Sequence, residues 1–153
     1  MNILDCFSNF YYHRFDIRFS STQDVAMNCW IGAVFRNGFL KVASEVYDDD
    51  NVSLYTHIET LPLSSNHPYY VQFNGGFPKG FYFNCSEFSS FTKGFVLKQQ
   101  HTYTIQLYLM GSFSKHWRLM LKALELFFMQ GIGYPRNPLR ILVILEIHYV
   151  YWI

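Results

Sequence analysis

The chain's six histidines are the side chains best suited to acid–base chemistry near neutral pH: His13, His57, His67, His101, His116 and His148. An imidazole with its ordinary pKa can take up or release a proton at physiological pH. His57 lies in a polar loop, and His116 stands beside Lys115 and close to Arg118, whose charges can stabilise a developing anion. We therefore rank His57 and His116 first as candidate catalytic residues.

The other four histidines are better explained as structural residues. His13 falls on the apolar side of an alternating segment, which is typical of a satisfied core residue. His67 precedes a proline, and His101 and His148 lie at strand edges without an evident partner. The histidines and cysteines lack zinc-ligand spacing, and the acidic run 48–51 lacks the glycine and distal glutamate of a calcium loop. We expect no metal and no cofactor.

Basic side chains provide a candidate surface for a polyanion. Lys115, Arg118 and Lys122 are three and four residues apart, so they share one side of a helix. A glycine-rich turn follows at 131–133, where backbone N–H groups can contact anions. We expect the cations to gather where this helix turns back into the sheet, although an ordinary solvated helix face explains them equally simply. The candidates for binding a polyanion such as RNA are Lys115, Arg118, Lys122, Gly131, Gly133, Arg136, Arg140, Arg14 and Arg18.

A strand–helix–turn–strand unit at 100–146 must position these residues. The alternation in 102–109 predicts a strand with one buried face. From Phe113 the apolar residues fall at helical spacing, and this helix ends at the glycine-rich turn. A closing strand at 139–147 is predicted to carry on one face Leu139, Ile141, Val143, Leu145 and Ile147.

The N-terminal part predicts a second set of elements. Residues 10–19 alternate as a strand, 30–46 have the period of a helix, and 68–74 form another strand, with an insertion at about 75–98. The order predicts an α+β, ferredoxin-like βαββαβ sandwich, with two helices on one face of an antiparallel sheet. Its open face either stacks RNA bases or is covered by a second domain, a partner or the insertion, and carries Tyr12, Arg14, Arg18, Tyr70 and Tyr108.

Composition narrows the setting of the protein. The 153 residues suffice for one domain (1–153), and a formal net charge of +1 excludes a global basic field. Three widely spaced cysteines indicate a reducing compartment, and neither a signal peptide nor a membrane span is recognisable. We expect a cytoplasmic protein. The aromatic finish at 149–153 indicates either packing on a partner or a fragment of a longer protein.

Several short motifs occur in a characteristic order: His67-Pro-Tyr-Tyr-Val-Gln-Phe73, Tyr103-Thr-Ile-Gln-Leu-Tyr-Leu-Met-Gly111, Ala123-Leu-Glu-Leu126 and Gly131-Ile-Gly133 with Arg136. Upstream, the first helix opens with Ile31-Gly32-Ala33 followed by Phe35-Arg36. In the family described next, an arginine stands at the position of Ile31. Over most of 10–147 this order resembles the RAMP superfamily of CRISPR-associated proteins. The likeness is greatest to its precursor-crRNA processing endoribonucleases, which serve antiviral defence.

The resemblance implies binding of CRISPR repeat RNA and its cleavage without metal, by attack of a 2′-OH on the neighbouring phosphate. Two departures matter, because the chain has no room for the family's second domain and 46–66 lack its cysteines. The alternative is a non-catalytic RAMP-like subunit, which binds RNA or docks on other CRISPR-associated proteins or on its own copies. A small αβ domain of unrelated function is the third interpretation.

Overall fold

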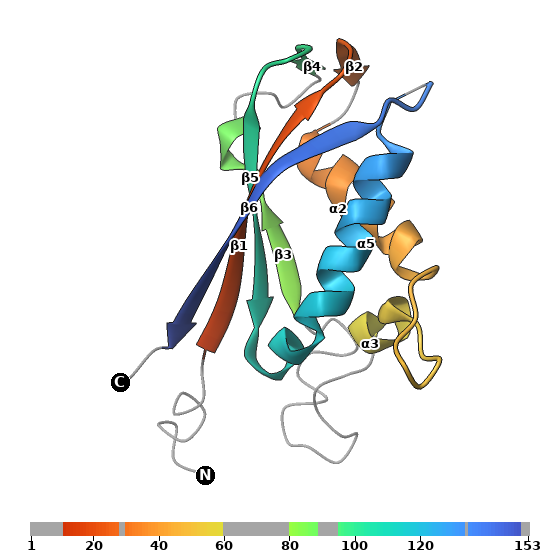
Figure 1. Cartoon of the computed structure of the whole chain (residues 1–153), viewed down its shortest axis with the longest axis vertical. Helices are drawn as coiled ribbons and strands as arrows, with labels where there is room; N and C mark the ends of the chain where they lie inside the picture. The colour runs from red at the N-terminus through yellow and green to blue at the C-terminus, as the bar shows by residue number, and fades with distance from the viewer. Residues whose placement is uncertain (1–10, 28–29, 60–79, 89–94, 134, 151–153) are drawn as a thin grey trace.

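The chain folds around a four-stranded antiparallel sheet with strand order β3-β5-β1-β6. A computed structural model describes residues 11–27, 30–59, 80–88, 95–133 and 135–150. The strands are β1 (Tyr11–Ser21), β3 (Phe81–Asn84), β5 (Tyr103–Met110) and β6 (Leu139–Val150). The two main helices, α2 (Ile31–Ala43) and α5 (Trp117–Gln130), pack together on one side of this sheet (Figure 1). The predicted α+β class with an antiparallel sheet is confirmed.

Alternation in β1 and β5 places one residue in two inside the core, as predicted. Phe15 pairs with Leu107 and Ile17 with Ile105 across the two strands, and all four side chains are buried. The intervening residues face away from the helices and form the open face of the sheet.

The helices close over this core through aromatic side chains. Phe35 of α2 makes edge-to-face contacts with Phe127 and Phe128 of α5, at ring-centroid distances of 5.5 and 5.7 Å. Gly38 of α2 lies against the Phe127 ring of α5, and a Cβ atom at this position would collide with that ring. The predicted helix 30–46 ends at Ala43, so it is slightly shorter than the periodicity indicates.

The predicted inner face of the last strand is wrong beyond Ile141. A register shift against Arg18 and Phe19 inserts one extra residue in β6, and Ile141 and Val143 then pair with successive residues of β1. A β-bulge of this kind reverses every side chain that follows it. Val143 and Leu145 therefore lie on the open face, 41% and 47% exposed, while Ile144 packs against the core.

The expected insertion at 75–98 also needs correction. Its residues Phe81–Asn84 form β3, an edge strand of the main sheet, and β4 (Phe95–Leu97) pairs with β2 (Val25–Met27) in a separate two-stranded sheet. A short helix, α3 (Leu54–Glu59), includes His57, for which the sequence predicts a polar loop. The predicted strand 68–74, with His67 and Tyr70, lies outside the described residues.

Candidate functional site

The two highest-ranked histidines come together at the N-terminal end of α5. His57 lies on α3, and His116 ends a 3-10 turn, η2 (Gly111–His116), that leads directly into α5. Their rings stack with centroids 4.2 Å apart and planes inclined by 27°. Both side chains are half-buried, so they remain within reach of a ligand at the surface. We call this arrangement the histidine pair.

Asp48, in the loop before α3, contacts the histidine pair through His57. Its Oδ2 lies 2.6 Å from Nε2 of His57, and its Oδ1 accepts hydrogen bonds from the backbone N–H groups of Asp50 and Val52. The hydrogen bond from Val52, followed by that from His57, lowers the pKa of Asp48 below its usual value. The Asp48 carboxylate therefore stays ionised and fixes the orientation of the His57 ring through the contact with Nε2. The acidic run has a structural role as a capped turn.

His116 is biased towards its neutral form. Burial is the largest cause that lowers its pKa from 6.5, followed by the neighbouring charges of His57 and Lys115, and Asp48 opposes them weakly. Two imidazoles in van der Waals contact repel each other when both are protonated. Burial and the contact with His57 therefore favour a neutral imidazole at His116, which is the form that a general base needs.

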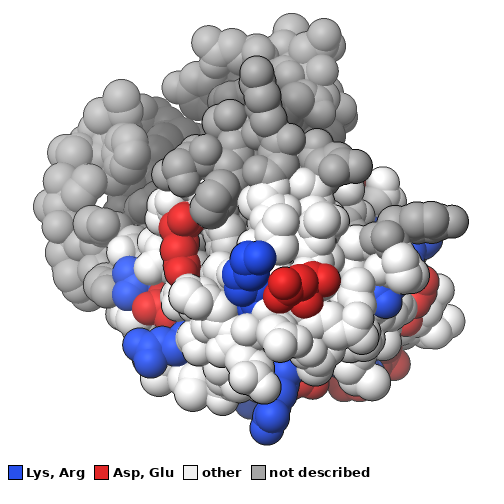
Figure 2. Space-filling model, turned by 90° about the horizontal axis from the view of Figure 1, so that it is seen from above, with Lys and Arg blue, Asp and Glu red and all other residues white. Residues whose placement is uncertain are grey.

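The basic residues around the start of α5 do not meet those of the glycine-rich turn. Lys115 of η2 adjoins His116, and Arg118 and Lys122 follow it on α5. All three are exposed, and Arg118 lies 5.0 Å from the centre of the Trp117 ring. Arg136 follows the opposite end of this 14-residue helix, which is roughly 20 Å long at 1.5 Å per residue. On the side of the molecule seen in Figure 2, Lys and Arg are scattered among Asp and Glu and form no continuous basic patch.

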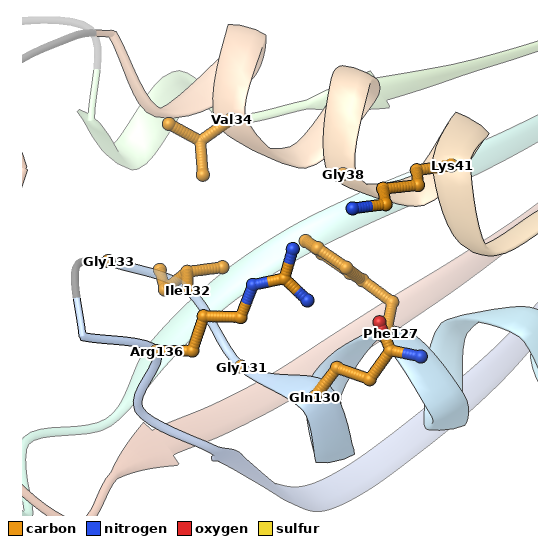
Figure 3. A pocket seen from close by; sticks show the side chains of 9 residues that line it. All are labelled: Val34, Gly38, Lys41, Phe127, Gln130, Gly131, Ile132, Gly133 and Arg136. Atoms are coloured by element: carbon orange, nitrogen blue, oxygen red, sulfur yellow. The ribbon is translucent and has the colours of Figure 1, made fainter.

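A small cavity lies instead at the C-terminal end of α5. It has a volume of about 160 Å³, and Lys41 of α2 and Arg136 both extend into it (Figure 3). Hydrophobic and polar side chains from both helices and the turn complete its wall. We call it the glycine-turn pocket, and its lining residues are Val34, Gly38, Lys41, Phe127, Gln130, Gly131, Ile132, Gly133 and Arg136.

The two glycines of this turn are needed for its shape. Gly131 and Gly133 have φ angles of +81° and +90°, and a Cβ at position 131 would collide with the backbone of Asn137. The N–H of Gly131 donates to Phe127, and Ile132 and Asn137 exchange two backbone hydrogen bonds. These N–H groups are therefore already satisfied. The charged side chains that line the glycine-turn pocket are Lys41 and Arg136.

The remaining candidate cations lie on the open face of the sheet. Arg14 pairs with Asp16 at 2.9 Å, which offsets its charge, whereas Arg18 and Arg140 are exposed. Three tyrosines cross the same face in a row, since Tyr108 stacks on Tyr82 at 4.6 Å and contacts Tyr12 at 5.6 Å. Tyr82 was not among the sequence candidates.

His13 is the buried core histidine that its strand position predicts. It is 3% exposed, its Nε2 lies 2.7 Å from Oε1 of Glu146, and its ring contacts Phe15. His101 is exposed, with its ring against Tyr103, and the side chain of His148 is outside the described part of the chain.

Sequence reasoning missed Asp48 and Lys41 as site residues. Asp48 stands in an acidic run that looks like a solvated break, and only its distance of nine residues from His57 hints at a partnership. Lys41 lies in the last turn of α2, and nothing local connects it to Arg136. Both depend on how separate elements pack.

Comparison with known proteins adds no name to this site. No protein-family model matches the chain, and no curated protein is similar enough to serve as a relative. Within the described ranges, no group of three or more His, Cys, Asp or Glu residues is arranged to hold a metal ion. Nor does any helix in these ranges have the length and apolar character needed to cross a bilayer.

Proposed function

We propose that this protein is a RAMP-like, ferredoxin-like domain that binds CRISPR repeat RNA and cleaves it without a metal ion, as part of cytoplasmic antiviral defence. The observation that carries the catalytic part is the histidine pair, in which His57 is held by Asp48 and stacks on His116. The RNA substrate and the family follow from the order of the sequence motifs.

The strand arrangement supports the ferredoxin-like assignment. Along the chain the main elements run β1-α2-β3-β5-α5-β6, and the sheet order β3-β5-β1-β6 places each helix between two strands that are not neighbours. A split β-α-β unit repeated twice has this organisation. The small β2-β4 sheet and α3 are additions to it.

In the proposed reaction the neutral imidazole of His116 removes the proton from an RNA 2′-OH. The 2′-oxygen attacks the adjacent phosphorus, and the bond from phosphorus to the 5′-oxygen of the next nucleotide breaks. His57, protonated beside Asp48, gives its proton to that leaving oxygen, so the products are a 2′,3′-cyclic phosphate and a 5′-OH. Lys115 is close enough in sequence to His116 to stabilise the charge that grows on the phosphate oxygens.

The glycine-turn pocket gives the RNA a second anchor. Lys41 and Arg136 extend into one cavity, and an arginine fork suits a phosphate oxygen pair. The length of α5, roughly 20 Å, separates this anchor from the histidine pair. A strand of several nucleotides is therefore required to contact both.

The direct test is incubation of the full chain with end-labelled repeat RNA in EDTA. We expect a product that ends in a cyclic phosphate, with loss of cleavage and retention of binding in His116→Ala. His101→Ala removes an exposed histidine at another site and is the matched control. Binding without any cleavage by the unmodified chain would remove the enzymatic claim, and equal activity in His116→Ala would remove the assigned mechanism.

One observation favours the non-catalytic alternative, a docking subunit. Leu142, Val143 and Leu145 are 42%, 41% and 47% exposed on the edge strand β6. Exposed apolar side chains in a row often mark protein contacts. Sedimentation analysis tests this function, since a docking subunit would self-associate or bind a CRISPR-associated partner, and Leu145→Lys would abolish that association.

A further inference from the structure

A second cavity lies between β3 and the start of α2. Its volume is about 350 Å³, within the range of about 300–1,000 Å³ that is typical of small-molecule sites. The wall comes from the start of α2, from β3 and from the end of β5. We call it the β3 groove, and its lining residues are Trp30, Gly32, Arg36, Phe81, Tyr82, Phe83 and Met110.

Two exposed aromatic rings line the β3 groove. Trp30 is 47% and Tyr82 46% exposed, although rings of this size are normally well covered. Their positions are fixed by packing, because any Cβ at Gly32 would collide with the Trp30 ring and Tyr82 stacks on Tyr108 with planes 3° apart. Such rings lose little freedom when a flat ligand stacks on them.

Arg36 supplies the positive charge of the β3 groove. It is exposed on α2, it lines the same cavity, and among the described residues it has no carboxylate partner within ion-pair distance. Aromatic rings combined with an arginine suit a ligand that is both planar and anionic, which describes a nucleotide.

The β3 groove is also connected to the histidine pair. Phe113 of η2 contacts Phe81, which lines the groove, at 6.2 Å, and contacts His116 at 5.3 Å. A single aromatic side chain therefore separates the groove from the proposed general base. A nucleotide whose base lies in the groove would place a neighbouring phosphate beside His116.

We propose that the β3 groove is the base-binding subsite for a nucleotide next to the cleaved phosphate of single-stranded RNA. The base stacks on Trp30 and Tyr82, and Arg36 contacts a backbone phosphate. This inference rests on the proposed function, of which it names the specificity-determining surface.

The test measures RNA binding by the fluorescence of Trp30 in a chain that carries Trp117→Phe and Trp152→Phe. The probe is an oligoribonucleotide with one 2′-deoxy residue at the cleavage position, so that binding is observed without reaction. We expect quenching of Trp30 by this RNA. An otherwise identical RNA with one abasic ribose beside the cleavage position should bind about 5- to 150-fold more weakly, which is the effect of losing one stacked base.

Tyr82→Leu and Arg36→Gln, with Trp30 retained as the probe, should weaken binding of the intact RNA and raise KM for the cleavable RNA without lowering kcat. Tyr82→Leu should bind intact and abasic RNA almost equally. Tyr55→Leu and Lys98→Gln remove an exposed ring and an exposed cation elsewhere and should leave binding unchanged. Equal binding of intact and abasic RNA by the parent chain would overturn the subsite.

The two proposals fail separately. RNA that quenches Trp30 in a base-dependent way but is never cleaved supports the groove and removes the nuclease. Cleavage with no dependence on the neighbouring base supports the nuclease and removes the groove.

Discussion

At the N-terminal end of α5, His116 stacks on His57, whereas at the C-terminal end Arg136 and Lys41 extend into a small cavity. The first end holds two imidazoles and a carboxylate. The second holds a lysine and an arginine. One rigid helix separates the two by a fixed distance.

This difference suggests that one end of α5 carries out the proposed cleavage chemistry and that the other end holds the RNA. Paired acid and base catalysis requires a group that can accept a proton, and burial beside His57 lowers the pKa of His116 in the histidine pair. Retention of a polyanion requires only permanent cations at a suitable place. The four predictions that follow test whether the two ends are independent in this sense.

The largest effect is expected at the histidine pair. His116→Ala or His57→Ala should lower kcat for RNA cleavage by about 10²- to 10⁴-fold, the usual contribution of general acid or base catalysis. RNA affinity should change little, because neither ring is required to carry the phosphate contacts. Single-turnover cleavage and filter binding measure the two quantities, and a parallel loss of affinity would mean that the two ends are not independent.

Gly131→Ala should damage the opposite end through the backbone. The residue has φ +81° and its new Cβ would press on Asn137, so we expect a loss of roughly 1–3 kcal/mol in the free energy of unfolding. Urea unfolding measures it, with the exposed Met129→Ala as control. Short RNA that reaches only the histidine pair should still be cleaved by the folded fraction, and an unchanged stability would show that the turn relaxes easily.

Lys41→Gln and Arg136→Gln should act on affinity alone. Each removes one charge-assisted contact, for which about a tenfold loss of RNA affinity is expected. The slope of log affinity against log salt should become shallower by about 0.7 for each phosphate contact to single-stranded RNA. Lys98→Gln is the control. A loss of kcat at saturating RNA would contradict the proposed division.

The smallest effect is a displacement of the pH dependence. The pKa of His116 lies below 6.5 because of burial, His57 and Lys115, so cleavage should fall only as the pH drops through that lowered value. Lys115→Gln should move this acidic limb to higher pH, and Asp48→Asn should move it to lower pH. The His116 Hε1 resonance followed by NMR gives the same pKa, and shifts in the same direction for both variants would contradict the assignment.

The same pKa fixes the sign of a stability effect. Between the lowered pKa and 6.5 the unfolded chain binds more protons at His116 than the folded chain does. The contribution of His116 to stability is therefore complete above pH 6.5 and declines as the pH falls across that window.

The sequence predicts the elements in which one periodicity persists. Alternation gives the buried faces of β1 and β5, and helical spacing gives the inner sides of α2 and α5. The prediction from periodicity fails at β6, because a bulge reverses the two faces of the strand without changing the apolar pattern. It also fails at β3, because four residues among turn signals are too few to show a period.

The sequence predicts which residue types form the candidate site, but it does not predict which of them are in contact. His57 and His116 stand out by their neighbours, yet their stacking depends on how α3 lies against η2, which no local pattern encodes. Arg118 lies in the first turn of α5, whereas Arg136 follows the glycine-rich turn beyond the other end of this helix. Lys41 becomes part of the site through the packing of α2 on α5, where Gly38 lies against the Phe127 ring.

The extra residue in β6 determines the character of two surfaces together. Upstream of it Leu139 lies in the core, and downstream Glu146 takes the inward position opposite Phe15 while its apolar neighbours turn outward. Deleting one residue at the bulge would reverse the two faces of β6 beyond it. Val143 and Leu145 would then point into the core, and the Glu146 carboxylate would lose its contact with His13 and point into water. One inserted residue therefore links two properties of the protein: the exposure of aliphatic side chains on β6 and the contact of the buried His13 ring with Glu146.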